Sequence, residues 1–159
     1  NAAAVIKALP DIRLQVDANL TIVGDGSERA TVETMFNPFP GQVRFLGRID
    51  SPAEMLAAFS EADLLVWPGV GEGVGMIYLE AQAAGLPVVA EDHPAPAELV
   101  AETCVPPSDP KAFANRIQHL SNPAIYREAS ANAAAHVRQT HSLAAASGIL
   151  WRTLNELLQ

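Results

Sequence analysis

Two glutamates in a glycine-rich stretch stand out by the chemistry that they could perform. Glu72 and Glu80 are eight positions apart in the run EGVGMIYLE, and glycine occupies positions 71, 73 and 75. Carboxylate oxygens accept hydrogen bonds from the vicinal hydroxyls of a ribose or a sugar ring. Glycines let a ligand approach the backbone closely because they carry no side chain. The stretch therefore predicts a binding site for a ligand that carries hydroxyl groups.

The start of a helix lies between the two carboxylates. The pattern predicts a helix over residues 76–84 that is closed by Gly85. The free N–H groups of Gly75, Met76 and Ile77 would open this helix and form an anion site suited to a diphosphate. One carboxylate on each side of such a site suits a ligand with hydroxyls at both ends, and a nucleotide sugar is such a ligand.

Each of these residues also has a plainer interpretation. Glu72 alone is typical of a solvated loop acid. Glu80 lies among apolar and small residues, where an ionised carboxylate needs a partner, and a lysine or arginine of a neighbouring helix could supply it. The glycines could serve only the geometry of the loop. The combination of the three features is what favours a ligand site.

Strands and helices alternate along most of the chain and must position these residues. The predicted strands cover residues 20–23, 42–46, 64–67, 87–90 and 104–105. The predicted helices cover residues 1–9, 27–36 with Ser27 as N-cap, 52–60 with Ser51 as N-cap, 76–84 and 95–100, followed by 110–120, 123–140 and 143–158. This order predicts an α/β domain, a Rossmann-like doubly wound parallel sheet with the C-terminal helices on its flank. The loop over residues 68–75 then lies beyond a carboxyl end of the sheet, where ligands bind.

Composition limits the class of partner. The 159 residues fit one domain, and 49% hydrophobic with 18% charged residues supports a packed core. A net charge of -8 excludes nucleic acid as the expected partner. No apolar run is long enough to span a membrane, and the chain shows no signal peptide pattern. The single cysteine, Cys104, favours a reducing compartment and a small buried side chain.

Other candidate residues fit known chemistry less well. The four histidines, His93, His119, His136 and His141, lack the spacing of a metal site, although the loop of His93 should face the cleft. The turn Gly24-Asp-Gly26 lacks the third glycine of a dinucleotide fingerprint. The serines near the C-terminus lack the context of a hydrolase nucleophile.

Several segments in register resemble one known family, the group 1 retaining glycosyltransferases of the GT-B fold. Glu72 and Glu80 have the spacing of the Glu-x7-Glu motif in the C-terminal domain of that family. Residues 21–29, 43–48, 62–68 and 80–90 are similar to its neighbouring segments. The resemblance covers the whole chain, residues 1–159, as a nucleotide-sugar-binding domain, one half of a GT-B fold, and is strongest over residues 20–100.

The resemblance implies a role for each matching position. Glu80 would hold the ribose hydroxyls, and Glu72 would be the catalytic-site carboxylate that contacts the donor sugar. The remaining implied contacts are Gly73, Val74 and Gly75 to the sugar, Met76 and Ile77 to the diphosphate, Gly47, Arg48 and Ile49 to the base, and Gly24 to the phosphates. No metal and no other cofactor is expected, because a helix dipole and basic side chains neutralise the leaving diphosphate.

The chain also departs from the family pattern. Val74 stands where the family has an aromatic residue, His93-Pro-Ala-Pro96 replaces a glycine-rich turn, and residues 141–143 replace a terminal aromatic-Ser-Trp pattern. The family's first strand, with an arginine and a lysine that grip the diphosphate, would lie before Asn1, and the acceptor-binding N-terminal domain is absent. The resemblance therefore implies a cytoplasmic hexosyltransferase of glycan biosynthesis in full length, peripheral at the inner membrane through the absent domain, and an inactive isolated domain.

Two other functional classes stay open from the sequence. A non-catalytic nucleotide or nucleotide-sugar binding module would keep Glu80 and the helix start without a working upstream half. An epimerase or phosphorylase of the GT-B fold is weaker, because a phosphorylase needs a pyridoxal-binding lysine and only Lys7 and Lys111 are present.

Overall fold

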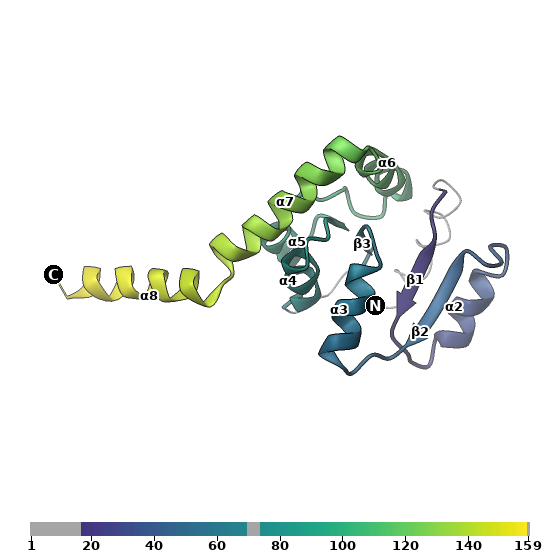
Figure 1. Cartoon of the computed structure of the whole chain (residues 1–159), viewed down its shortest axis with the longest axis horizontal. Helices are drawn as coiled ribbons and strands as arrows, with labels where there is room; N and C mark the ends of the chain where they lie inside the picture. The colour runs from purple at the N-terminus through teal and green to yellow at the C-terminus, as the bar shows by residue number, and fades with distance from the viewer. Residues whose placement is uncertain (1–16, 70–73, 159) are drawn as a thin grey trace.

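The computed structural model describes residues 17–69 and 74–158, so the helix predicted over residues 1–9 lies outside the described residues. Strands β1 (Leu20–Val23), β2 (Val43–Gly47), β3 (Leu65–Trp67) and β4 (Val88–Ala90) alternate with helices α2 (Arg29–Met35), α3 (Pro52–Ser60), α4 (Met76–Ala83) and α5 (Pro94–Leu99) (Figure 1). Helices α6 (Pro110–Leu120), α7 (Pro123–Thr140) and α8 (Leu143–Leu157) complete the chain. The predicted helices and the first four predicted strands in the described residues are confirmed, with ends that move by one or two residues. The strand predicted over residues 104–105 is reduced to a single bridge residue, Val105.

The strands pair in parallel, as the α/β pattern predicts. β1 pairs with β2, and β3 pairs with β4 in a register that sets Trp67 opposite Ala90. Glu91 forms a parallel bridge to Val105, which extends the second pair on the far side of β4. Among the described residues the two pairs are not hydrogen-bonded to each other. The Rossmann-like α/β class is confirmed, and its described strands form two sheets of two strands.

The core lies on both faces of β4, because successive side chains of a strand point to opposite faces. Val89 packs with buried residues of α6 and α7. Val88 and Ala90 pack on the other face with buried residues of α3 and α4. Both faces of the strand are therefore covered, which explains why all three of its residues are apolar.

Local capping chemistry determines several helix starts. Ser51 Oγ accepts a hydrogen bond from Glu54 N at 3.4 Å, and Pro52 occupies the first turn, as predicted. The prediction of Ser27 as the N-cap of α2 is wrong, because Glu28 occupies that position without a side-chain cap. Arg29 N donates to Gly26 O at 3.1 Å, so a turn over these residues delays the helix until Arg29.

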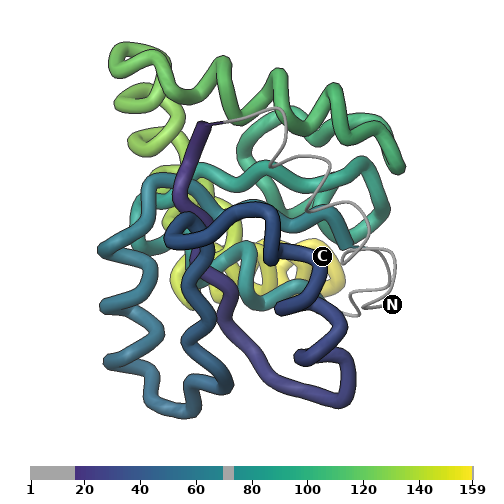
Figure 2. Tube along the Cα trace, turned by 90° about the vertical axis from the view of Figure 1, so that its right-hand side faces the viewer, coloured from purple at the N-terminus to yellow at the C-terminus, as the bar shows by residue number. Residues whose placement is uncertain are grey.

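The three C-terminal helices differ from one another in how much of their surface is buried. Figure 2 shows α7, in green, as a long rod along one side of the molecule, and both α6 and α7 bury residues in the core. The prediction that α8 also packs on the flank is wrong. Helix α8 buries no residue and extends away from the rest of the molecule (Figure 1).

Cys104 is half-buried beside the cluster that covers Val88 and Ala90, which agrees with its predicted role as a small core side chain. Burial raises the pKa of the Cys104 thiol, and the nearby charge of Asp92 raises it further. The raised pKa leaves less of the reactive thiolate at a given pH.

Candidate functional site

The carboxyl ends of β3 and β4 meet at one edge of their sheet. Trp67 pairs with Ala90, so the chain leaves β3 at Pro68 and β4 at Glu91 from neighbouring positions. The segment after β3 then leads into α4, whose N-cap is Gly75. Ligands of open α/β sheets bind at this kind of edge.

The start of α4 is closely packed on its inner side. Gly75 is buried with a φ of 65°, in the left-handed region that glycine adopts readily. A methyl group on Gly75 would lie 2.7 Å from Tyr78 Cδ2 and 3.1 Å from Leu99 Cδ1. Only glycine therefore fits this position.

The outer side of the same helix start is accessible. The side chains of Val74 and Met76 are exposed, and Ile77 is half-buried. The N–H groups of the first helical turn, including Met76 and Ile77, have no acceptor within the helix. The positive end of the helix dipole lies here too, so the geometry suits an anionic oxygen.

Glu80 lies on the accessible face of α4. It is one turn after Met76, and residues four apart on a helix are neighbours on its surface. Glu80 is exposed, whereas the next two residues, Ala81 and Gln82, are buried. Side chains on a helix lean toward its N-terminus, which directs the Glu80 carboxylate toward the helix start. No hydrogen bond or ion pair to this carboxylate occurs among the described residues, so none of the described helices supplies the partner that the sequence left open.

Glu72 and Gly73 lie outside the described residues. Their contacts to a donor sugar stay a prediction, as does the catalytic-site role of Glu72. Val74 and Gly75 are the described members of the predicted sugar-binding group.

A second group of predicted residues lies at the carboxyl ends of β1 and β2. Gly24 N donates to Gly47 O at 2.7 Å, which joins the ends of the two strands. Gly47 is buried with a φ of 68°, and Gly24 is exposed. Arg48 is exposed and pairs with Asp50 at 2.6 Å, and Ile49 is half-buried. The two groups lie on separate strand pairs, and no hydrogen bond joins them among the described residues.

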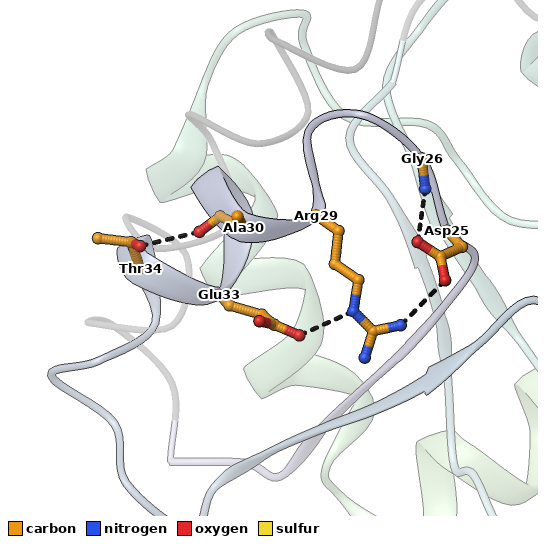
Figure 3. Close-up of polar contacts among 6 residues, drawn as sticks. All are labelled: Asp25, Gly26, Arg29, Ala30, Glu33 and Thr34. Atoms are coloured by element: carbon orange, nitrogen blue, oxygen red, sulfur yellow. Dashed lines mark hydrogen bonds and ion pairs between the residues drawn. The ribbon is translucent and has the colours of Figure 1, made fainter.

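A charged network that the sequence reasoning missed supports the turn after β1 (Figure 3). Arg29 donates from Nε to Glu33 Oε1 at 2.8 Å and from Nη1 to Asp25 Oδ2 at 3.1 Å. Asp25 Oδ1 also accepts from Gly26 N at 2.8 Å. The hydrogen bond to Glu33, followed by that to Asp25, raises the pKa of Arg29. The four-residue spacing of the three side chains was the available signal, because it favours ion pairs on a helix.

Gln82 holds α5 against α4 from a buried position that the sequence did not indicate. Its side chain donates from Nε2 to Tyr78 O at 2.9 Å and to Leu99 O at 2.8 Å. Its Oε1 accepts from Ala101 N at 2.8 Å. The amide is thus satisfied on both ends, as a buried polar group requires.

Comparison with known families gives a match over most of the chain. The model of the family described as "Glycosyl transferases group 1" matches residues 1–122. No helix within residues 17–69 and 74–158 is long and apolar enough to cross a membrane.

Curated relatives share the same region. A GDP-mannose-dependent monoacylated alpha-(1-6)-phosphatidylinositol monomannoside mannosyltransferase from Corynebacterium glutamicum is 39% identical over 95 residues, which are 55% of this chain and 25% of that protein. A phosphatidyl-myo-inositol mannosyltransferase from Mycobacterium leprae is 33% identical over 132 residues, 79% of this chain and 35% of that protein. The chain therefore spans about a quarter to a third of the length of these relatives.

Solved structures have the same fold. Sucrose-phosphate synthase from Thermosynechococcus elongatus matches 99% of this chain and 44% of its own, with a TM-score of 0.78 and 29% identity. The Anabaena protein HepE in complex with UDP matches 97% of this chain and 44% of its own, with a TM-score of 0.75 and 23% identity. The second likeness shows the fold alone.

Proposed function

Because the chain belongs to the group 1 glycosyl transferases, we propose that it is the donor-binding domain of a retaining glycosyltransferase of the GT-B fold. The complete enzyme moves a hexose from a nucleoside diphosphate to an acceptor. The relatives described above are named as mannosyltransferases, which favours an enzyme over a non-catalytic binding module.

The arrangement at the start of α4 carries this proposal. The N–H groups of Met76 and Ile77 lie at the carboxyl edge of β3 and β4, and Glu80 lies one turn later on the exposed face. A diphosphate at the helix start brings the attached ribose within reach of the Glu80 carboxylate. The carboxylate then accepts hydrogen bonds from the two vicinal hydroxyls of the ribose.

The remaining contacts complete the donor site in this proposal. Glu72 contacts the donor sugar, which is lined by Gly73, Val74 and Gly75. Gly47, Arg48 and Ile49 border the base, and Gly24 lies near the phosphates. The helix dipole and backbone N–H groups neutralise the departing diphosphate without a metal ion.

The complete protein supplies the acceptor site and the missing strand of the sheet. In the doubly wound order 3-2-1-4-5-6, a strand separates the pair β1–β2 from the pair β3–β4. The matched structures have more than half of their length outside the matched part, which leaves room for a second domain. A cytoplasmic enzyme attached peripherally at the inner membrane accords with the phosphatidylinositol acceptors named for the relatives.

Replacement of Glu80 by glutamine in the full-length protein tests the proposal. The affinity for GDP or UDP should fall about tenfold, because a hydrogen bond to a charged group contributes roughly 1.5–3 kcal/mol. The loss should be smaller for the 2′-deoxynucleotide, which offers Glu80 one hydroxyl fewer. Calorimetry measures both affinities, and donor turnover should fall in parallel.

Glu128→Gln is the matched control, since Glu128 is exposed on α7 and lies outside the proposed site. Equal affinities of the wild type and of Glu80→Gln for both nucleotides would contradict the ribose contact. If the wild-type protein turns over neither GDP-sugars nor UDP-sugars, the proposed enzymatic activity is contradicted.

A further inference from the structure

Glu91 is a buried carboxylate at the end of β4. It is 5% exposed and directly follows the last residue of the strand. Its Oε1 accepts a hydrogen bond from Ser108 N at 2.9 Å, and its Oε2 lies 3.2 Å from His93 Nε2. Buried carboxylates are uncommon and call for partners, and these two groups hold this one in place.

The contact with Glu91 orients the imidazole of His93. A carboxylate oxygen accepts, so Nε2 carries the proton and donates it. Nδ1 is then the ring nitrogen that remains available for a hydrogen bond to another group. The side chain of His93 is 27% exposed, and no partner for Nδ1 occurs among the described residues. The histidine is thus held on one side and available on the other.

His93 belongs to the edge where the proposed donor site lies. It is three residues after Ala90, the partner of Trp67 in the neighbouring strand. The helix that follows His93, α5, is joined to α4 by Gln82, which bonds Leu99 O and Ala101 N. The α5 segment is therefore fixed to the last turn of α4, and Leu99 of α5 also lies beside the helix start, 3.1 Å from where a methyl group on Gly75 would be.

The backbone just after His93 has few hydrogen-bond donors, so a ligand there must be bound mainly by side chains. Pro94 and Pro96 carry no backbone N–H, so this segment offers fewer main-chain donors to an anion or a hydroxyl. An imidazole fixed by a buried carboxylate supplies a polar group at the same place. The hydrogen bond from Nε2 to a carboxylate fixes the orientation and the tautomer of the ring, as a carboxylate does for histidines that bind metals.

We infer that His93 contacts the sugar-diphosphate part of the donor through Nδ1, and that Glu91 is the residue that positions it. The inference rests on the proposed function. Neutral Nδ1 accepts a hydrogen bond from a sugar hydroxyl, and protonated Nδ1 donates one to a phosphate oxygen. The β-phosphate and the sugar are the two groups that a nucleoside monophosphate lacks, so the assigned contact is to an oxygen of one of these two groups.

Calorimetry on the full-length protein tests this assignment with a nucleoside monophosphate, the diphosphate and the nucleotide sugar. His93→Ala should weaken binding of the nucleotide sugar about tenfold and leave the monophosphate within about twofold. An equal loss for the diphosphate supports a phosphate contact, and a loss confined to the nucleotide sugar supports a sugar hydroxyl. His119→Ala, at an exposed position of α6, should bind all three ligands like the wild type.

A double-mutant cycle tests the positioning role of Glu91. Glu91→Gln should lower the affinity for the nucleotide sugar several-fold in the wild-type background. It should cause no further loss of affinity in the His93→Ala background. His93→Gln serves as the second variant if thermal melting shows that His93→Ala is unfolded. Unchanged binding of all three ligands, or equal losses that include the monophosphate, would overturn the inference. A wild-type protein that binds no nucleotide would instead overturn the proposed function, and the inference with it.

Discussion

Gly75 is the single residue on which the geometry at the start of α4 depends most directly. Its left-handed backbone turns the chain into the helix, and its missing side chain leaves room for Tyr78 and Leu99. The exposed neighbours Val74 and Met76 face solvent at the same point. A close-packed inner side and an open outer side thus meet at one glycine.

Replacement of Gly75 by alanine should disturb both stability and nucleotide binding. The added methyl group would clash with Tyr78, and the left-handed backbone is unfavourable for alanine, at a cost of about 1–3 kcal/mol. Thermal melting and nucleotide affinity should both fall. Gly26→Ala is the matched control, because a methyl group there meets nothing within 4 Å. Similar melting temperatures and affinities for the two variants would contradict this account.

Among the elements, α8 differs from the two helices before it, α6 and α7, which both bury residues in the core. It is capped by Ser142 and yet buries no residue. Its large apolar side chains gather mainly on one face by helical spacing, and they include Leu143, Leu150, Trp151, Leu154, Leu157 and Leu158. An exposed apolar stripe of this length is typical of a surface that another part of the protein covers.

The fluorescence of Trp151 tests whether the second domain proposed above covers this stripe. Trp151 is 67% exposed in the present structure, so iodide should quench it strongly in this chain alone. In the full-length protein the quenching should fall severalfold, because the apolar face would be buried. Both proteins carry Trp67→Phe, so that Trp151 is the one tryptophan left in this part of the protein. The substitution removes a buried indole N–H without a described partner. Equal quenching in both proteins, over a dilution series that excludes self-association, would show that the stripe stays open.

At the scale of the molecule, the two strand pairs define where the sheet is incomplete. Leu20 N donates to Gln42 O and Gly24 N donates to Gly47 O, so β1 faces β2 with alternate N–H groups. The N–H groups of Thr21 and Val23 therefore face the other edge, where no described strand pairs with β1. The proposed additional strand would lie along this edge.

Hydrogen exchange tests the proposed strand directly. The amides of Thr21 and Val23 should exchange at least about tenfold more slowly in the full-length protein than in this chain alone, because a ladder protects them. Leu20 serves as the internal control, since its N–H is already bonded to β2. Equal slowing at Leu20 would indicate only a more stable protein, and no slowing at Thr21 and Val23 would exclude the strand.

Short-range sequence signals predicted most of the described helices and strands, and they placed the candidate site between β3 and α4. Caps such as Ser51 and Pro52 act within one turn, and the apolar run of β3 specifies a strand covered on both faces. The strand-to-helix passage before Met76 likewise follows from residues close together in the chain. Such local signals are readable because each depends on neighbours a few positions away.

Contacts between residues far apart in the chain became visible only in the folded molecule. One hydrogen bond joins Glu91 and Ser108, and another joins Gln82 and Leu99. The two residues of each pair are 17 positions apart in the chain. The exposure of Glu80 and of the apolar face of α8 also depends on which elements pack beside them. A sequence pattern specifies how a segment folds locally, but it contains no periodic signal for the partner that long-range packing brings to it.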